Sequence, residues 1–243
     1  FHYCYSSTYC EQQSNAINFQ QFESDFQHYQ INCFAIGDSH TKCCYNNIPY
    51  CNSYIYGAFT MHRAGRDQLK FLNLKKFLIN KKRTKSNDII ILSLGEIDIR
   101  NHIVYQSNKQ KRHIDELLEE LVSNYEKTIL LNKALYKKLY IIISLIIPPA
   151  NINYKVTRLP YVGSIEERIY ATQKINKKLI DMCKRNNFYY IDTYQDYANN
   201  LGYLPYELSD GGVHLNNDVN CFIKLQLQEI YKDIFNNLKF KNN

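Results

Sequence analysis

Short apolar runs recur along the chain, and each ends in polar or glycine residues. The clearest runs cover residues 33–36, 88–94, 139–147 and 188–191, and a weaker candidate covers residues 53–56 or continues through Met61. Because successive side chains of a strand point to opposite faces, an unbroken apolar run indicates a strand buried on both faces. The pattern therefore predicts a mostly parallel sheet of five strands.

Helical periodicity fills the intervals between these runs. Apolar residues recur at helical spacing at 69–78, at 114–125 and from Val219 towards the C-terminus. Ser164 and Glu167 form a capping-box pattern, with Ser164 as the N-cap of a helix that continues to Met182. Strands that alternate with helices predict an α/β fold, a three-layer sandwich with right-handed crossovers.

We expect one α/β domain over residues 31–243, preceded by an irregular leader. Residues 1–30 are rich in Tyr, Gln and Ser and show no clear periodicity, apart from one short helix expected near residues 19–26. The 243 residues suffice for a single core, and no internal repeat or linker divides them. The first residue is Phe1 rather than Met, so we expect a fragment or a processed form.

Composition excludes several classes of protein. Apolar residues make up 45% and aromatic residues 14% of the chain, which excludes intrinsic disorder. The densest part of the +7 net charge, residues 81–85, is interpreted as a solvated loop rather than a nucleic-acid patch. The longest apolar run, 139–147, is far shorter than the ~20 residues that cross a bilayer. We therefore predict no nucleic-acid partner and no membrane span, and leave the oligomeric state open.

The eight cysteines include no Cys-x-x-Cys pair, and Cys33 and Cys183 lie within apolar patterns. Thiols at such positions pack as small hydrophobic groups, which favours a reduced, cytoplasmic protein. The even number leaves a secreted protein with disulfides as the alternative.

Polar groups follow two of the predicted strands closely. Gly37, Asp38 and Ser39 follow the first strand, where a glycine lets the chain turn sharply and present a serine hydroxyl. Residues 95–102, after the strand at 88–94, include four ionisable groups: Glu96, Asp98, Arg100 and His102. Since ligands of α/β sandwiches bind beyond the carboxyl ends of the strands, these groups are candidates for a functional site. A turn or N-cap at Ser39, and salt bridges at 96–102, are the structural alternatives.

A glycine-bearing loop after the last predicted strand supplies an acid and a histidine, Asp210 and His214. An acid that accepts a hydrogen bond from a histidine sets its tautomer and stabilises its protonated form, while the other ring nitrogen faces a serine. The sequence therefore predicts Ser39 as nucleophile, His214 as its base and Asp210 as the group that orients the base. Such a site needs neither a metal nor an organic cofactor.

The residues named above resemble the SGNH, or GDSL-type, serine esterases and lipases, over about residues 31–235. The matching segments are Gly37-Asp38-Ser39, Gly95-Glu96-Ile97-Asp98 and the loop from Asp210 to His214. With Gly-Asp-Ser-His and Thr-Met-His-Arg segments, the chain resembles a subgroup of polysaccharide-gene and large-virus proteins. The resemblance implies a flavodoxin-like sandwich and an acyl-serine mechanism on carbohydrate O-acetyl groups, lipids or thioesters. The Gly-x-Ser-x-Gly elbow of α/β-hydrolases is absent.

The resemblance also implies an oxyanion hole, for which the chain departs from the family pattern. The family's second block supplies a glycine N–H, here expected from Gly65, with Gly57 as the weaker candidate. The family's third block supplies an asparagine amide, whereas this chain has Ile97, which cannot donate. We expect Arg100, or else His102, to act as the missing donor, and a structural pair of Arg100 with Glu96 or Asp98 is the alternative.

A second departure is that three residues, rather than two, separate Asp210 from His214. The Gly211-Gly212 pair could absorb the additional residue.

We therefore expect a serine esterase that cleaves O-acyl esters, O-acetyl esters first, of a small molecule or a glycan. An O-acyltransferase using the same serine, and a non-catalytic glycan-binding or scaffold domain, are the alternatives. The loop at 151–163 follows a strand and is expected to border the site, where Tyr154, Arg158 and Tyr161 either contact a sugar or are ordinary loop residues.

Overall fold

A computed structural model describes residues 15–57, 59–75, 88–136, 138–151 and 160–242. Its centre is a parallel sheet in the order β2-β1-β3-β4-β5. The strands are β1 (Cys33–Gly37), β2 (Cys51–Ile55), β3 (Ile89–Ser93), β4 (Tyr140–Ser144) and β5 (Tyr189–Ile191). The expected α/β sandwich with a five-stranded sheet is confirmed, and every strand pair is parallel.

The burial of each strand explains how clear its apolar pattern is in the sequence. All residues of β1 and β3 are buried, which matches their unbroken apolar runs. The edge strand β2 is only partly buried, which matches its mixed sequence. The alternative in which this strand continues through Met61 is wrong, because Thr60 is the N-cap of a helix there and accepts a hydrogen bond from Arg63 N at 3.1 Å.

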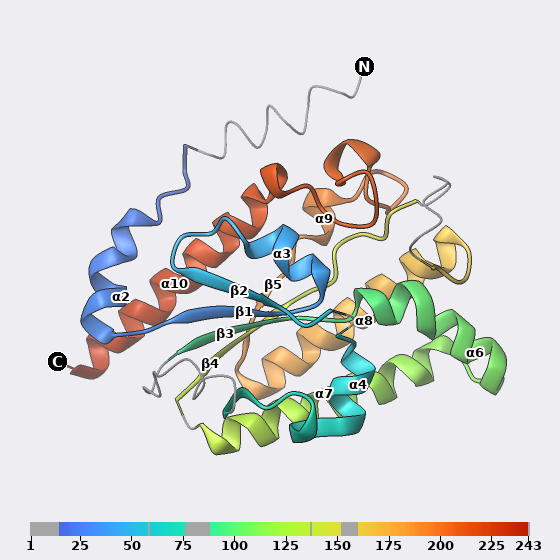
Figure 1. The fold of residues 1–243 in the computed structure, drawn as a ribbon, viewed down its shortest axis with the longest axis horizontal. Coiled ribbons are helices and arrows are strands. Elements are labelled where there is room, and N and C mark those ends of the chain that lie inside the picture. Colours follow the sequence, from blue (N-terminus) through green and yellow to red (C-terminus); the bar gives the residue numbers. More distant parts are fainter. Residues whose placement is uncertain (1–14, 58, 76–87, 137, 152–159, 243) are drawn as a thin grey trace.

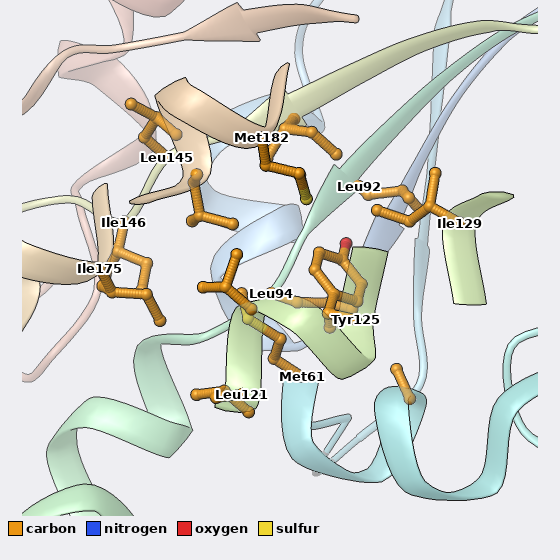
Figure 2. Close-up of a cluster of buried hydrophobic side chains, with 14 of the residues drawn as sticks. Met61, Leu92, Leu94, Leu121, Tyr125, Ile129, Leu145, Ile146, Ile175 and Met182 are labelled. Atoms are coloured by element: carbon orange, nitrogen blue, oxygen red, sulfur yellow. The ribbon is translucent and has the colours of Figure 1, made fainter. Parts of the chain in front are cut away.

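Helices cover both faces of the sheet (Figure 1). One face carries α4 (Met61–Asp67), α7 (Ile114–Leu135) and α8 (Ile165–Asn186), and the other carries α2 (Glu23–Tyr29), α3 (Ser39–Tyr45) and α10 (Cys221–Asn242). Each face has its own buried apolar cluster. Figure 2 shows part of the first, where Met61, Leu94 and Tyr125 lie among side chains of β3, α7 and α8. Burial of this kind contributes about 25 cal/mol per Å² of apolar surface.

Several helix boundaries follow from local sequence signals. The capping box of Ser164 and Glu167 is present at the start of α8. The helix predicted at 69–78 is wrong for residues 69–73, which follow α4 and form the end of a short 3-10 turn (Gln68–Lys70) and then an irregular segment. After β3 the chain forms a π-helical segment, η3 (Asp98–Ile103), which continues into α6 (Val104–Gln110). Such π-helical turns are rare and occur often at functional sites.

The short helix expected near residues 19–26 is present, as η1 (Gln20–Phe22) and α2 (Glu23–Tyr29), but the packed part of the chain begins before Ile31, so this segment is not an irregular leader. Phe19, Phe22 and Phe26 are buried, and all three rings contact Tyr231 of α10. Aromatic pairs of this geometry contribute about 0.5–1.5 kcal/mol beyond their buried area. The segment around α2 is therefore part of the α10 face of the sandwich.

Some sequence expectations fall outside the described residues, namely the first part of the leader, the basic cluster at 81–85, Tyr154 and Arg158. Among the described cysteines, five have free thiols, whereas Cys221 is disulfide-bonded. No helix in the described part of the chain is long and apolar enough to span a membrane.

The strand order places the functional residues. The chain leaves β1 to form β2 on one side and then returns to form β3 on the other, so the order reverses between β1 and β3. In open α/β sheets, the crevice for ligands lies at the carboxyl ends of the strands that flank such a reversal. The segments beginning at Asp38 and Leu94 emerge there.

Candidate functional site

Ser39 is held at the end of β1 by two local features. The first is Gly37, where a Cβ atom would lie 1.9 Å from the Ser93 carbonyl oxygen, so only glycine allows β1 and β3 to meet there. The second is Asp38, the N-cap of α3, whose carboxylate accepts a hydrogen bond from His40 N at 2.9 Å. Ser39 is therefore the first residue of α3; its side chain is exposed and its N–H precedes the helical hydrogen-bond ladder.

The loop that carries Asp210 and His214 is folded back on itself. Asp210 N donates to the His214 carbonyl oxygen at 3.0 Å, and an antiparallel bridge joins Ser209 to Leu215. Gly211 has a φ of +84°, a conformation that side-chain-bearing residues rarely adopt. Gly212 N in turn donates to Asp210 Oδ1 at 2.9 Å. The loop thus absorbs the additional residue between the acid and the histidine.

The side chains of Asp210, His214 and Ser39 form a continuous chain of contacts. His214 Nδ1 lies 2.8 Å from Asp210 Oδ2, and His214 Nε2 lies 2.8 Å from Ser39 Oγ. Because an ionised carboxylate only accepts hydrogen bonds, it selects the tautomer with a proton on Nδ1. Nε2 is then free to accept the proton of the serine hydroxyl. The three residues expected to act together are thus assembled from α3 and a loop about 170 residues later in the chain.

A second histidine contacts the first. His40, next to Ser39 on α3, is buried, and its ring centroid lies 4.6 Å from that of His214. His40 Nε2 is 3.1 Å from Glu96 Oε2, and Glu96 Oε1 accepts a hydrogen bond from Arg100 Nε at 2.7 Å. Arg100 Nη1 also donates to the Pro160 carbonyl oxygen at 2.6 Å. A buried chain of charges therefore runs from η3 to the ring of His214.

The expectation that Arg100 donates to an oxyanion is wrong, and the structural alternative holds. Its guanidinium is buried and already contacts Glu96 and the Pro160 carbonyl oxygen. The backbone carbonyl oxygen of Arg100 accepts a hydrogen bond from Val162 N at 2.8 Å. Releasing this group would leave Glu96 without its cation in a buried place, which is costly. His102 likewise has a different setting, since it lines a cavity with His62 beside α4 and α6.

The expectation for Gly65 is also wrong. Gly65 lies inside α4, where backbone N–H groups are bonded along the helix axis to carbonyls four residues earlier. A Cβ atom at this position would come within 2.9 Å of Asn124 Cβ, so the glycine allows α4 to pack closely on α7. Gly57, the weaker candidate, lies directly beyond β2, after Tyr56, whose N–H donates to Gly37 O at 2.9 Å. Gly57 is exposed and has a φ of +58°.

Sequence reasoning also missed the role of Asp98. Its buried carboxylate accepts hydrogen bonds from Met61 N at 2.7 Å and His62 N at 3.1 Å, at the start of α4. Burial raises the pKa of Asp98 to about 7, against the opposite effect of these two backbone donors. Through these hydrogen bonds, Asp98 ties the segment after β3 to the segment after β2. The signal was an acid two residues after Glu96, in a cluster that a solvated turn does not explain.

The electrostatics distinguish the two histidines. Burial lowers the pKa of His214, and the neighbouring His40 lowers it further, against the opposite effect of Asp210. Burial also lowers the pKa of His40, but Glu96 outweighs burial and the net shift is upward. Glu96 has its pKa lowered to about 2, because His40 and Arg100 outweigh burial. Of the two imidazoles, His214 therefore remains neutral at lower pH, as a base should.

A cavity of about 480 Å³ lies between α4, α6 and α7, within the range of ligand pockets. It is lined by three apolar side chains, Ile103, Leu117 and Leu121, and otherwise by polar and charged residues that include His62 and His102. Asp98 is part of the wall and follows Glu96 by two residues, so the cavity begins close to the segment that contacts His40.

Comparisons with known proteins agree with the fold. Two solved structures share this fold, a GDSL-like lipase from Bacteroides thetaiotaomicron (TM-score 0.57, 11% identity, 89% of this chain and 98% of that one) and the acetyl xylan esterase AlAXEase (TM-score 0.51, 14% identity, 82% and 99%). A third is phospholipase A1 from Streptomyces albidoflavus (TM-score 0.51, 10% identity, 82% and 98%). No curated protein matches the sequence significantly.

The family described as GDSL-like lipase/acylhydrolase matches residues 12–223. This range contains Ser39, Asp210 and His214, and it covers most of the chain. The expected SGNH-type fold and hydrolase class are thereby confirmed, with the match beginning ahead of Ile31. The chain belongs to the GDSL-like lipase/acylhydrolase family.

Proposed function

We propose that the protein is a serine esterase that removes O-acyl groups, chiefly O-acetyl groups, through a Ser39–His214–Asp210 triad. The observation that carries this proposal is the pair of 2.8 Å contacts that link Ser39 Oγ to His214 Nε2 and His214 Nδ1 to Asp210 Oδ2. A binding or scaffold domain has no need for this relay. Ser39 is exposed, so a substrate carbonyl can reach it.

The proposed reaction follows the acyl-serine route. His214 accepts the proton of Ser39 Oγ while this oxygen attacks the ester carbonyl carbon. The protonated ring is stabilised by Asp210 and gives its proton to the leaving alkoxide, which departs as the alcohol. Water, deprotonated by the same ring, then hydrolyses the acyl-serine and restores the free hydroxyl.

The oxyanion is proposed to bind to backbone N–H groups of Ser39 and Gly57. Ser39 N–H lies at the first position of α3, where the positive end of the helix also favours negative charge. Gly57 is next to Tyr56, whose N–H bonds to Gly37 O, so it lies beside the turn that carries Ser39. One donor of this kind is typically worth about 2.7–4 kcal/mol of barrier.

A polar alcohol such as a glycan is the proposed leaving group. The 480 Å³ cavity beside Asp98 combines a few apolar side chains with many hydrogen-bonding groups, a lining that suits a sugar ring. AlAXEase, which has this fold, is named as an acetyl xylan esterase, whereas the Streptomyces albidoflavus relative is a phospholipase A1. The mixed lining of the cavity favours the first kind of substrate over a long acyl chain.

A fluorophosphonate probe tests the nucleophile directly. Wild-type protein should become labelled on Ser39, as located by peptide mass spectrometry, while a folded Ser39→Ala variant should not. A series of aryl esters from acetate to octanoate should show the highest kcat/KM for acetate, and acetylated oligosaccharides should release acetate. Folded wild-type protein that neither reacts with the probe nor releases acetate would refute the proposal.

A further inference from the structure

A cysteine lies on the same face of α3 as the nucleophile. Cys43 follows Ser39 by four residues, and residues at this spacing are neighbours on a helix surface. Its thiol is free and half-buried, on the side that faces the loop of Asp210 and His214. Burial and the Asp210 carboxylate raise the pKa of Cys43 to about 11, so the thiol is neutral and does not compete with Ser39.

Three different ligand atoms converge there. Cys43 Sγ, a carboxylate oxygen of Asp210 and a ring nitrogen of His214 all lie within 4.8 Å of one another. In a tetrahedral zinc site, with bonds of about 2.0–2.3 Å, ligand atoms are about 3.3–3.8 Å apart. Small side-chain rotations would therefore bring the three atoms onto one ion, and the glycines of the loop allow such adjustment. Among the described residues, this is the one set of three His, Cys, Asp or Glu side chains with such spacing.

The donor set selects the kind of ion. A thiolate, an imidazole and a carboxylate together suit Zn²⁺ or Cd²⁺, whereas Mg²⁺ and Ca²⁺ prefer oxygen ligands alone. The half-open position of His214 and the exposure of Asp210 leave a fourth coordination position for water. Three protein ligands with one open position are also what solvent-accessible zinc sites use.

We propose that Cys43, Asp210 and His214 form an inhibitory site for a thiophilic divalent cation such as Zn²⁺. This inference rests on the proposed function for its effect on catalysis. On binding, the cation replaces the thiol proton, which passes to solvent, and forms bonds to sulfur, nitrogen and oxygen without any change of oxidation state. The ion withdraws His214 and Asp210 from their hydrogen bonds, so Ser39 loses its base. Removing the ion restores the relay.

Inhibition of ester hydrolysis tests the site, with Cys43→Ser as the variant and Cys51→Ser as the matched control. Cys51 also lacks a disulfide and is half-buried, but its Sγ lies 3.7 Å from Cys33 Sγ and it starts β2, at the opposite end of the sheet. With the thiols kept reduced by a phosphine, Zn²⁺ should inhibit the wild type and Cys51→Ser equally, and EDTA should reverse the effect. Cys43→Ser should keep its basal kcat/KM within about twofold and need at least tenfold more Zn²⁺ for half inhibition. Mg²⁺ should not inhibit any of them.

A direct binding measurement separates this inference from the proposed function. Titration with Cd²⁺ should produce a cadmium–thiolate charge-transfer absorption in wild type and Cys51→Ser that Cys43→Ser lacks, whether or not the protein hydrolyses esters. Equal Zn²⁺ inhibition of wild type and Cys43→Ser, or a Cd²⁺ signal unchanged by Cys43→Ser, would overturn the proposed site. Absence of turnover and of fluorophosphonate labelling, with the Cd²⁺ signal intact, would overturn the proposed function alone.

Discussion

Two carboxylate–imidazole pairs lie side by side at the carboxyl ends of β1 and β3, and their surroundings differ. Asp210 and His214 are on a loop, and their side chains are 40% and 17% exposed. The side chains of Glu96 and His40 are 12% and 6% exposed. Arg100 forms an ion pair with Glu96. The rings of the two histidines are 4.6 Å apart.

The difference shows how burial and partners assign roles to identical chemical groups. The outer imidazole keeps one nitrogen for Ser39 and has its pKa lowered by burial and by the inner ring. The inner imidazole has its pKa raised, because Glu96 outweighs its burial. Proton transfer needs a group that changes its charge near the working pH. Of the two rings, that of His214 meets this requirement. The inner pair supplies a fixed charge and a rigid surface against which the base rests.

Substituting one histidine at a time is the most direct test of whether the two histidines have different roles. His214→Gln should lower kcat/KM by about 10⁴- to 10⁶-fold, as loss of a base in an acyl-serine mechanism does, and Ser39→Ala should cost as much. His40→Gln should lower kcat/KM at the optimum pH by about tenfold or less, because the inner ring exchanges no proton with substrate. Hydrolysis of an aryl acetate measures all three. Wild-type turnover by folded Ser39→Ala, or an equal loss in both histidine variants, would contradict the assignment.

Asp210→Asn should have the next largest effect. Asparagine can present its amide N–H₂ to His214 Nδ1, which favours the tautomer with the proton on Nε2 and so opposes the base. We expect kcat to fall by about 10²- to 10⁴-fold with KM nearly unchanged, less than for His214→Gln, because the outer pair is partly solvated. Asp218→Asn, an exposed acid beyond the same loop, is the control and should be silent. A loss seen in KM alone would argue against the orienting role.

The fold could be read from the sequence because its signals are local. Buried strands such as β1 and β3 appear as unbroken apolar runs, and the capping box at Ser164 marks a helix by itself. The second half of the leader could not be read in the same way. Its phenylalanines find their partners on α10, more than 200 residues later, and no local pattern reveals such a contact.

The site was predictable where the chemistry needs particular residues, and was not where it needs a position in space. Ser39, Asp210 and His214 follow strand ends and could be expected to meet. Gly65 fits the family's second block by its position along the chain, but α4 begins at Met61 and places Gly65 against α7. The Arg100 side chain is long enough to reach either an oxyanion or Glu96. It pairs with Glu96, because residues four apart on a helical segment are neighbours.

Arg100→Ala should affect stability rather than turnover. Removing one member of a buried ion pair leaves the other uncompensated, which costs about 3–5 kcal/mol. We expect the free energy of unfolding in urea to fall by about that amount, while kcat per folded molecule stays within about threefold of wild type. Arg185→Ala, which removes an exposed pair with Glu126, should cost at most about 1 kcal/mol. A large drop in kcat with unchanged stability would instead support Arg100 as a donor to the oxyanion.

The smallest expected effect is a shift in the pH profile caused by His40→Gln. In the proposed mechanism, ester hydrolysis needs neutral His214, so kcat/KM should fall as pH drops through the pKa of this ring. In the wild type this pKa lies below the usual value, since burial and His40 both lower it, while Asp210 and Glu96 act in the opposite direction. Because the pKa of His40 is shifted upward, His40 carries its proton at the pH where His214 titrates.

Glutamine at position 40 removes this neighbouring charge, so the pKa of His214 should rise and the acidic limb of the profile should move to higher pH. The variant should therefore lose more of its rate at mildly acidic pH than at pH 8, relative to wild type. A set of kcat/KM values against pH measures the shift, with His113→Gln, an exposed histidine at the start of α7, as the control that should leave the limb in place. An acidic limb that stays fixed or moves to lower pH in His40→Gln would mean that the inner pair only packs against His214 and does not tune it.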